Sequence, residues 1–462
     1  MSTPYSFPHS DTIVALATAH GKGAIAVIRL SGPEAITIAD RLFHGKSLAE
    51  QESHTLHFGT LREEGKIIDE VVVSLFKAPH SYTRENVVEI SCHGSDYIVE
   101  QIVKAALRQG ARLAQAGEFT KRAFLNGQLD LAQAEAVADL IASDSHLSHE
   151  VAMKQMRGGF SQEIKALRAQ LIHFASMIEL ELDFGEEDVE FADRSALQKL
   201  IYDIQRLIRS LLKSFEFGNV IKNGVPVVII GKPNAGKSTL LNALLNEEKA
   251  IVSDVAGTTR DFIEDEINLE GISFRFIDTA GLRETTDKVE SIGVERTLKK
   301  VGEASLVLYL FDVQATTPEE LAAETEALQL ADTKTLLAVA NKIDMVAAPD
   351  LAPYQAIADT VSISAAKGAG MESLKQKLIG TVKSQQLDTS NQTIVTNLRH
   401  YQSLENTNAA LDDVLNGLAI HISGDLLASD IRRALYSLGE ITGEITTDDL
   451  LENIFTKFCI GK

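Results

Sequence analysis

Apolar residues recur every three to four positions along several long stretches of the chain. This spacing places the apolar side chains on one face of a helix, which is typical of helices that pack against other elements. The predicted helices of this kind cover residues 129–141, 164–182, 197–217, 399–418, 426–438 and 447–458. They predict a helical domain built from two separated parts of the chain.

A different pattern begins at residues 225–230, which form a nearly unbroken β-branched run. Such a run is expected of a strand that is buried on both faces of a parallel sheet. Two further apolar strands are predicted at 306–311 and 335–340, and the intervening segments include predicted helices at 238–245 and 318–328. This alternation predicts a doubly wound α/β domain.

The first 125 residues mix both patterns. Short β-rich runs at 24–30 and 71–76 accompany a helix-like segment at 95–108, which predicts an α+β domain. We therefore expect a multidomain protein. Its predicted parts are an N-terminal α+β domain (1–125), a discontinuous α-helical domain (126–220 and 383–462) and an inserted α/β domain (221–382). Insertion is feasible because the ends of a domain often lie close together.

The composition fits a globular protein without a membrane anchor. Of the 462 residues, 45% are hydrophobic and 24% are charged, and no apolar run is long enough to span a membrane. The N-terminus lacks the features of a signal peptide, so we expect a cytoplasmic protein. The net charge of −21 argues against a surface made for indiscriminate nucleic-acid binding. Two cysteines, Cys92 and Cys459, do not suggest a disulfide framework.

The segment GKPNAGKS at residues 231–238 matches the P-loop motif and lies between a predicted strand and a predicted helix. Its glycines allow backbone N–H groups to wrap phosphates, and the helix N-terminus adds positive potential. Lys237 is expected to neutralise the β- and γ-phosphates, and the Ser238 hydroxyl is expected to bind magnesium. The inserted domain is therefore predicted to be a P-loop nucleotide-binding domain.

The segment NKID at 341–344 follows the predicted strand at 335–340 and selects the base. The Asp344 carboxylate accepts hydrogen bonds from the ring N–H and 2-amino group of guanine, whereas adenine offers neither donor. Residues 364–366, Ser-Ala-Ala, are expected to close over the base oxygen with backbone N–H groups. The sequence thus predicts GTP as the ligand.

Two further segments complete this site. DTAG at 278–281 follows a predicted strand and is expected to approach magnesium and the γ-phosphate, and Thr259 is placed to bring a second hydroxyl to magnesium. The predicted nucleotide-binding residues are Asn234, Ala235, Gly236, Lys237, Ser238, Thr239, Ser253, Asp254, Val255, Ala256, Gly257, Thr258, Thr259, Asp278, Thr279, Ala280, Gly281, Asn341, Lys342, Asp344, Ser364, Ala365 and Ala366.

The hydrolytic apparatus differs from that of small signalling GTPases. Leu282 stands where those proteins have a water-orienting glutamine, so Glu290 is the candidate for positioning water, with a solvated glutamate at a helix start as the alternative. No arginine finger stands out. A potassium ion held by Asn234, Ser253 and the backbone of 255–258 is a candidate replacement for its charge, although Asn234 also fits as an ordinary loop residue.

The chain as a whole resembles the MnmE (TrmE) family of tRNA modification GTPases. The matching segments are DTIVA at 11–15, IRLSG at 28–32, GEF at 117–119, RAFLN at 122–126, LDLAQAE at 129–135, ITGE at 441–444 and CIGK at 459–462. The resemblance implies an N-terminal domain that forms a homodimer and binds a tetrahydrofolate derivative, a helical domain made of two segments, and an inserted GTPase domain.

The resemblance also implies a reaction. In this family the partner is the flavoprotein MnmG, which uses FAD and NADH, and the two proteins form a heterotetramer. Together they install an aminomethyl or 5-carboxymethylaminomethyl group on the wobble uridine of certain tRNAs, with methylenetetrahydrofolate as the one-carbon donor. Hydrolysis of GTP in the family requires Mg²⁺ and is activated by K⁺.

Family positions carry over to individual residues. The magnesium ligands fall on Ser238 and Thr259, the potassium ligands on Asn234, Ser253, Val255 and Thr258, and the water-positioning glutamate on Glu290. The folate-binding positions fall on Arg29, Glu89, Gln128 and Lys462. Chemically, Arg29 suits the glutamyl carboxylate of a folate and Glu89 suits the donors of its pterin ring. Gln128 replaces a lysine that some members have.

Cys459 lies in the C-terminal CIGK segment, where the resemblance implies a thiol near the folate one-carbon group. An inert tail and a prenylation signal are the alternatives, and lysine as the last residue is atypical of the latter. Two other functions compete with tRNA modification. One is a ribosome-assembly GTPase of the Era or EngA kind, and the other is a switch whose nucleotide state only recruits partners.

Overall fold

The computed structural model describes residues 11–183, 194–249, 265–277, 301–328, 335–346, 352–384 and 393–461. Contacts divide the chain into two compact units. The first comprises residues 1–141, 153–204 and 403–462, and the second comprises 142–152 and 205–402. Among the described helices, none has the length and apolar character needed to cross a membrane.

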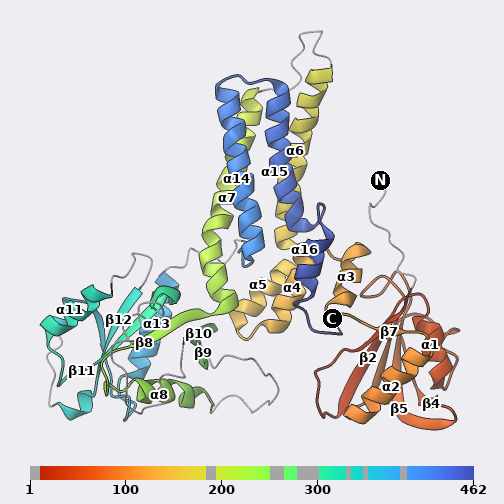
Figure 1. Ribbon diagram of the computed structural model, residues 1–462, viewed down its shortest axis with the longest axis horizontal. Coiled ribbons are helices and arrows are strands. Elements are labelled where there is room, and N and C mark those ends of the chain that lie inside the picture. Colours follow the sequence, from red (N-terminus) through yellow and green to blue (C-terminus); the bar gives the residue numbers. More distant parts are fainter. Residues whose placement is uncertain are drawn as a thin grey trace. The chain divides into compact units, whose positions relative to one another are not determined.

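The N-terminal part of the first unit is built around a seven-stranded sheet with the strand order β3-β4-β5-β6-β2-β1-β7 (Figure 1). All described pairs in it are antiparallel except β1 with β7. The strands are β1 (Ile13–Leu16), β2 (Ile25–Ser31), β3 (Phe43–His44), β4 (Thr55–Glu63), β5 (Lys66–Phe76), β6 (Val87–His93) and β7 (Arg112–Leu113).

Helices lie on both faces of this sheet. Helices α1 (Ala35–Leu42) and α2 (Asp96–Arg108) cover one face, because Ile28 and Leu30 of β2 share a buried core with them. Side chains alternate along a strand, so Arg29 lies on the opposite face. On that face Phe119 of α3 (Glu118–Leu125) packs with Ile13 and Ala15. The α+β class predicted for this part is therefore confirmed.

Long helices form the rest of the first unit and part of the second. They are α4 (Leu131–Ala142), α5 (His146–Met156), α6 (Gly159–Asp183), α7 (Arg194–Asn223), α14 (Leu398–Ala419), α15 (Gly424–Thr442) and α16 (Asp448–Phe455). Helices α6 and α15 are joined by an ion pair between Glu179 and Arg432, at 2.6 Å. Helices α4 and α16 share a core in which Leu131 and Ala134 pack with Phe455.

The second unit contains a six-stranded sheet with the order β13-β12-β11-β8-β10-β9. All neighbouring strands are parallel except β9 and β10, which form an antiparallel pair. The strands are β8 (Val225–Ile230), β9 (Asp265–Leu269), β10 (Ile272–Phe276), β11 (Leu306–Asp312), β12 (Thr335–Asn341) and β13 (Asp359–Ser362). The central position of β8 explains its continuous apolar sequence.

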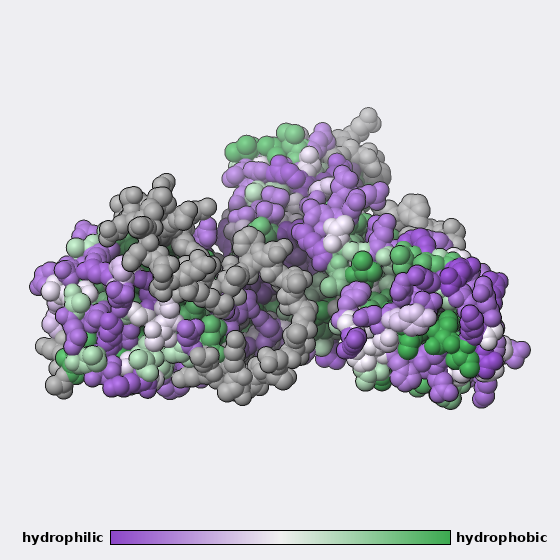
Figure 2. Space-filling view, turned by 60° about the horizontal axis from the view of Figure 1, so that its bottom comes forward, coloured by the Kyte–Doolittle hydropathy of each residue, from purple (hydrophilic) through white to green (hydrophobic). Residues whose placement is uncertain are grey.

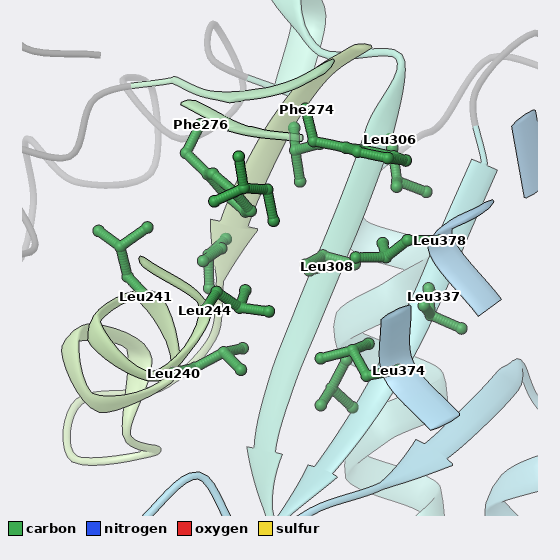
Figure 3. Close-up of a cluster of buried hydrophobic side chains, with 14 of the residues drawn as sticks. Leu240, Leu241, Leu244, Phe274, Phe276, Leu306, Leu308, Leu337, Leu374 and Leu378 are labelled. Carbon is green, nitrogen blue, oxygen red and sulfur yellow. The ribbon is translucent and has the colours of Figure 1, made fainter. Parts of the chain in front are cut away.

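Both faces of this sheet are covered by helices. Helices α8 (Lys237–Lys249) and α13 (Met371–Ser384) cover one face, where leucines of both helices meet Phe274 and Leu308 (Figure 3). Helices α11 (Pro318–Ala327) and α12 (Ala352–Gln355) lie on the other, and a short 3-10 helix, η1 (Ile343–Met345), follows β12. The predicted doubly wound architecture is confirmed.

Candidate functional site

The P-loop joins the end of β8 to the start of α8. Gly231 has φ +145°, and a Cβ on it would lie 2.0 Å from the Leu310 carbonyl oxygen. Gly236 has φ +98°, and a Cβ there would lie 2.4 Å from the Asn341 side-chain nitrogen. Only glycine fits both constraints, so the loop packs tightly against β11 and β12. This is the backbone cradle that the phosphate motif requires.

Two polar residues of the loop are held in defined positions. Asn234 is exposed and has a left-handed backbone, with φ +63°. The Lys237 ammonium donates to the carbonyl oxygens of Gly231 (2.7 Å) and Lys232 (2.9 Å), and burial lowers its pKa. The ammonium is therefore held close to the loop backbone where phosphates would bind. Ser238 and Thr239 follow in the first turn of α8.

Asn341, at the end of β12, connects two loops. Its side-chain nitrogen donates to the carbonyl oxygen of Ala235 at 2.8 Å, and its side-chain oxygen accepts from the N–H of Ala365 at 3.0 Å. Asn341 is buried, as are Ser364 and Ala365, whereas Ala366 is exposed. The P-loop and the 364–366 segment are thus fixed to the same side chain.

Asp344 lies in η1, three residues after Asn341. A hydrogen bond with Ser364, helped by the Lys367 ammonium at 3.2 Å, lowers the pKa of its carboxyl. The carboxylate is therefore ionised at neutral pH and is a strong acceptor for paired N–H donors. It lies at the carboxyl edge of the parallel sheet, where ligands of such folds bind.

Three ion pairs next to the site escaped prediction. Lys342 has φ +65°, and its ammonium contacts Asp312 at 2.8 Å. Asp312 ends β11, so the rule that ligands gather at strand carboxyl ends could have identified it. The P-loop residue Lys232 contacts Glu320 (3.2 Å) and Glu324 (3.0 Å) of α11. Nothing in the sequence pattern pairs these residues.

Several predicted residues lie outside the described part of the chain. They are Ser253, Asp254, Val255, Ala256, Gly257, Thr258, Thr259, Asp278, Thr279, Ala280, Gly281, Glu290 and Lys462. Of the predicted metal ligands, Asn234 and Ser238 are described. The roles of all these residues stay predictions.

A second group of predicted residues meets on the N-terminal sheet. Arg29 and Glu89 are register partners on β2 and β6, and the two side chains form an ion pair at 2.8 Å. The Arg29 guanidinium carbon lies 5.5 Å from the ring centre of Tyr82 and 5.6 Å from that of Phe119. The Tyr82 hydroxyl is hydrogen bonded to Thr120 at 2.9 Å. Neither aromatic residue was predicted, because loop and helix residues reach this face only in the folded chain.

Gln128 has a different neighbour. Its side-chain oxygen accepts from the Arg84 guanidinium at 2.9 Å, and the same guanidinium donates to the Asn126 carbonyl oxygen at 3.0 Å. The described contacts therefore place Gln128 beside Arg84 and do not bring it into contact with the Arg29–Glu89 pair. Arg84 is a further basic group near a predicted ligand residue.

The C-terminal segment lies against the N-terminal domain. Ile460 forms a bridge with Ala116, and the Cys459 carbonyl oxygen accepts from the N–H of Gly117 at 3.3 Å. Cys459 is an exposed free thiol, whereas Cys92 is buried and its pKa is raised to about 11, mainly by burial. Gly117 precedes α3 by one residue, so Cys459 lies close to the helix that carries Phe119.

Comparison with known proteins covers the whole chain. A family model for the "MnmE helical domain" matches residues 131–459, and one for the "GTP-binding protein TrmE N-terminus" matches residues 12–128. The tRNA modification GTPase MnmE of Cytophaga hutchinsonii is 61% identical over 462 residues, which are 100% of both chains. The chain belongs to the MnmE family of tRNA modification GTPases. MnmE proteins of Flavobacterium johnsoniae and Bacteroides thetaiotaomicron are 54% and 52% identical, and each alignment covers 98% of this chain and 100% of the relative.

Membership in the MnmE family confirms the resemblance that the sequence motifs suggested. The helical family model begins before the α/β domain and ends after it, which agrees with a discontinuous helical domain. The full-length match to a tRNA modification GTPase also argues against the alternative of a ribosome-assembly GTPase.

The structure brings together two residues of the predicted MnmE folate site, and their assignments to parts of the ligand stay predictions. Arg29 was assigned to the glutamyl carboxylate and Glu89 to the pterin ring, which are opposite ends of a folate separated by its p-aminobenzoyl ring. The two side chains are in contact at 2.8 Å.

Proposed function

We propose that this MnmE-family protein hydrolyses GTP at the carboxyl edge of its six-stranded sheet. The observation that carries the proposal is the double hydrogen bond of Asn341, which ties the P-loop to the 364–366 segment beside Asp344. This arrangement places a phosphate cradle and a carboxylate acceptor on one sheet edge. A nucleotide with paired N–H donors on its base, namely a guanine nucleotide, fits both.

In the proposed reaction, Lys237 neutralises the β- and γ-phosphates and the P-loop N–H groups hold them, with Ser238 and Thr259 as magnesium ligands. Glu290 orients the attacking water. Asn234, Ser253, Val255 and Thr258 would hold a potassium ion. When bound, magnesium and potassium would supply positive charge to the phosphates in place of an arginine finger. Asn234 is exposed in the P-loop, so its side chain is accessible to an ion there.

Steady-state hydrolysis with GTP, ATP and XTP tests this proposal. The wild-type protein is expected to prefer GTP, and Asp344→Asn is expected to shift the preference to XTP, because an amide donor pairs with the 2-oxo group of xanthine. Turnover in potassium is expected to exceed turnover in sodium. Equal use of GTP and ATP, or a D344N variant that keeps GTP preference, would reject the base assignment. Equal rates in potassium and sodium would reject the proposed activation by potassium.

We also propose that the protein acts with the flavoprotein MnmG, as a heterotetramer with FAD and NADH as its redox groups. The product is the 5-carboxymethylaminomethyl or aminomethyl group on the wobble uridine of certain tRNAs. A tetrahydrofolate derivative, bound by Arg29, Glu89, Gln128 and Lys462, is the one-carbon donor, with Cys459 nearby. The Arg29–Glu89 pair supports a polar ligand site on the sheet. The proposed domains are 1–125, 126–220 with 383–462, and 221–382, in a cytoplasmic protein.

A homodimer formed through the N-terminal sheet is part of this proposal. Leu56 and Phe58 of β4 are 70% and 72% exposed, and Val72, the register partner of Phe58, is 37% exposed. We call these three residues the apolar sheet face. Hydrophobic residues gather on the exposed surface of this domain (Figure 2). Exposed apolar residues on neighbouring strands favour association with another protein surface, and a second copy of the chain is the proposed occupant.

A further inference from the structure

Helix α7 (Arg194–Asn223) carries an excess of positive charge in an acidic chain. The chain has a net charge of −21, and the long helices α6, α14 and α15 each contain more acidic than basic residues. Helix α7 (Figure 1) reverses this balance, since Asp203 and Glu216 are its acidic residues and six of its residues are basic. The basic residues are Arg194, Lys199, Arg206, Arg209, Lys213 and Lys222.

Four of these basic residues share one face of α7 with an aromatic residue. They are spaced alternately three and four residues apart, which keeps side chains on one face of a helix. From first to last they span about 21 Å, at about 1.5 Å per residue. All lie on one continuous helix, so their spacing follows from the helix alone. We call them the basic stripe, and its exposed members are Lys199, Tyr202, Arg206, Arg209 and Lys213.

The opposite face of α7 is buried. Leu197, Ile204 and Leu211 are at most 2% exposed, and each basic residue of the stripe is two positions away from one of them. Two residues correspond to about 200° around a helix, so the basic side chains point away from the core. Because its apolar face is already covered, α7 does not resemble a basic amphipathic helix that inserts into a lipid surface.

The positive charges of the stripe are poorly compensated within the protein. Among the side chains that the structure describes, Lys199, Arg209 and Lys213 have no ion-pair partner. Arg209 also follows Arg206 by three residues and precedes Lys213 by four. Like charges at these spacings destabilise a helix by about 0.2–0.5 kcal/mol per pair. The stripe therefore weakens the free helix, and an anionic partner laid along it would remove this repulsion.

We propose that the basic stripe binds the phosphate backbone of the tRNA. The inference rests on the tRNA modification activity that family membership shows, which makes tRNA the polyanion at hand. A row of cations about 21 Å long faces several successive phosphates, and each Lys or Arg that meets a phosphate releases counterions. Tyr202, 51% exposed, offers its ring to an unpaired base beside the backbone. Phosphate contacts of this kind position the RNA without reading its sequence.

Binding of fluorescently labelled tRNA to the full-length protein, measured by anisotropy over a range of salt concentrations, tests the stripe. The variant combines Arg209→Ala with Lys213→Ala. The matched control combines Lys46→Ala with Lys66→Ala, two exposed lysines of the N-terminal domain, so it changes the net charge by the same amount. Thermal unfolding and GTP hydrolysis are measured for both, because neither pair belongs to the proposed nucleotide site. Capture of the flavoprotein MnmG by each variant tests a protein partner instead of RNA.

We expect R209A/K213A to weaken tRNA binding by at least about tenfold at about 0.1 M salt. The slope of log K against log salt should become shallower by about 0.7–0.9 for each lost phosphate contact. K46A/K66A should bind tRNA as the wild type does, and both variants should keep GTP hydrolysis.

Equal losses of tRNA binding in the two double variants would indicate an effect of net charge and overturn the proposal. Unchanged tRNA binding in R209A/K213A would also overturn it, whether or not capture of MnmG is lost, as would wild-type protein that binds no tRNA. Each of these results leaves the proposed GTP hydrolysis standing, because GTP turnover by the wild type is measured separately.

Discussion

Asn341 shows how one side chain can organise a nucleotide site. Sequence reasoning expected it to bind nucleotide, and the structure shows that its amide is already used by two backbone groups, on Ala235 and Ala365. Both bonds are buried. The side chain therefore ties the P-loop to the 364–366 segment.

Replacing Asn341 by alanine is expected to leave the Ala235 carbonyl and the Ala365 N–H unpaired. Each buried unpaired group costs about 1–3 kcal/mol, so GTP and GDP affinity should fall by at least about tenfold. Equilibrium binding of a fluorescent guanine nucleotide measures this loss. Asn223→Ala is the matched control, because Asn223 is an exposed asparagine in the same unit, and its side chain is bonded to Asn219 of the same helix, away from the P-loop. Unchanged affinity in N341A would contradict the bridging role.

The residue types of the nucleotide site were predictable, whereas many of their partners were not. A P-loop and an NKxD segment are local in sequence, and their positions after strands follow from the apolar pattern. The pairing of Arg29 with Glu89 depends on the register between β2 and β6, which are 60 residues apart. Because register is set by the folded sheet, sequence reasoning did not predict this ion pair.

The C-terminal segment, residues 459–461, packs against β1 and α3 of the first unit. Gly461 has φ +97°, and a Cβ on it would lie 2.0 Å from the carbonyl oxygen of Leu16 in β1. Gly117 has φ +65°, and a Cβ there would lie 2.6 Å from the Phe455 carbonyl oxygen. Two glycines therefore allow the chain end to approach β1 and α3.

Gly461→Ala is expected to release this segment. The left-handed backbone costs a non-glycine residue about 1–2 kcal/mol, and the clash with Leu16 adds to that cost. Hydrogen exchange should become faster at the Gly117 N–H, which bonds to Cys459, with little change in the sheet core.

Gly110→Ala separates the cost of a left-handed backbone from the cost of the clash with Leu16. Gly110 also has a positive φ, +105°, but a Cβ on it would meet nothing within 4 Å. G110A should keep slow exchange at Gly117. Equal acceleration in both variants would show that backbone strain alone is responsible and would contradict the close-approach explanation.

Element types were predictable and element lengths were less so. The helix predicted at 197–217 extends over Arg194–Asn223, because its apolar face continues to Ile221, which is buried. Of the β9–β10 hairpin, only the second strand, which precedes the DTAG segment, was predicted. Its first strand has a mixed pattern in which Ile267 and Leu269 are buried and Glu266 is exposed.

At the scale of the whole molecule, the apolar sheet face predicts a dimer. Phe58→Asp is expected to shift the protein to monomers in sedimentation velocity, because a charge at the interface must be desolvated without a partner. Thermal stability of the monomer should change little, since Phe58 is 72% exposed.

Ile420→Asp is the control for charge alone, because Ile420 is 74% exposed and lies just after α14. The I420D protein should remain a dimer. An F58D variant that sediments as the wild type does, or an I420D variant that dissociates to the same extent, would rule out the apolar sheet face as the interface.

The multidomain plan was predictable because each part has its own apolar period. Short β-rich and apolar runs mark the sheets, and a period of three to four residues marks the helical segments. The position of the α/β segment between two helical parts then implied an insertion, and the family match over residues 131–459 agrees. Neither pattern carries information about dimerisation, which depends on which apolar residues stay exposed.

The central claim is that GTP hydrolysis in this chain serves tRNA modification. Mass spectrometry of tRNA nucleosides from a deletion strain tests it directly, with the strain complemented by the wild-type protein or by Glu290→Ala. The wild type is expected to restore the modified wobble uridine, and E290A, with GTP binding retained, is expected to leave it absent. Restoration by E290A together with lost hydrolysis, or failure of the wild type to restore the modification, would contradict the claim.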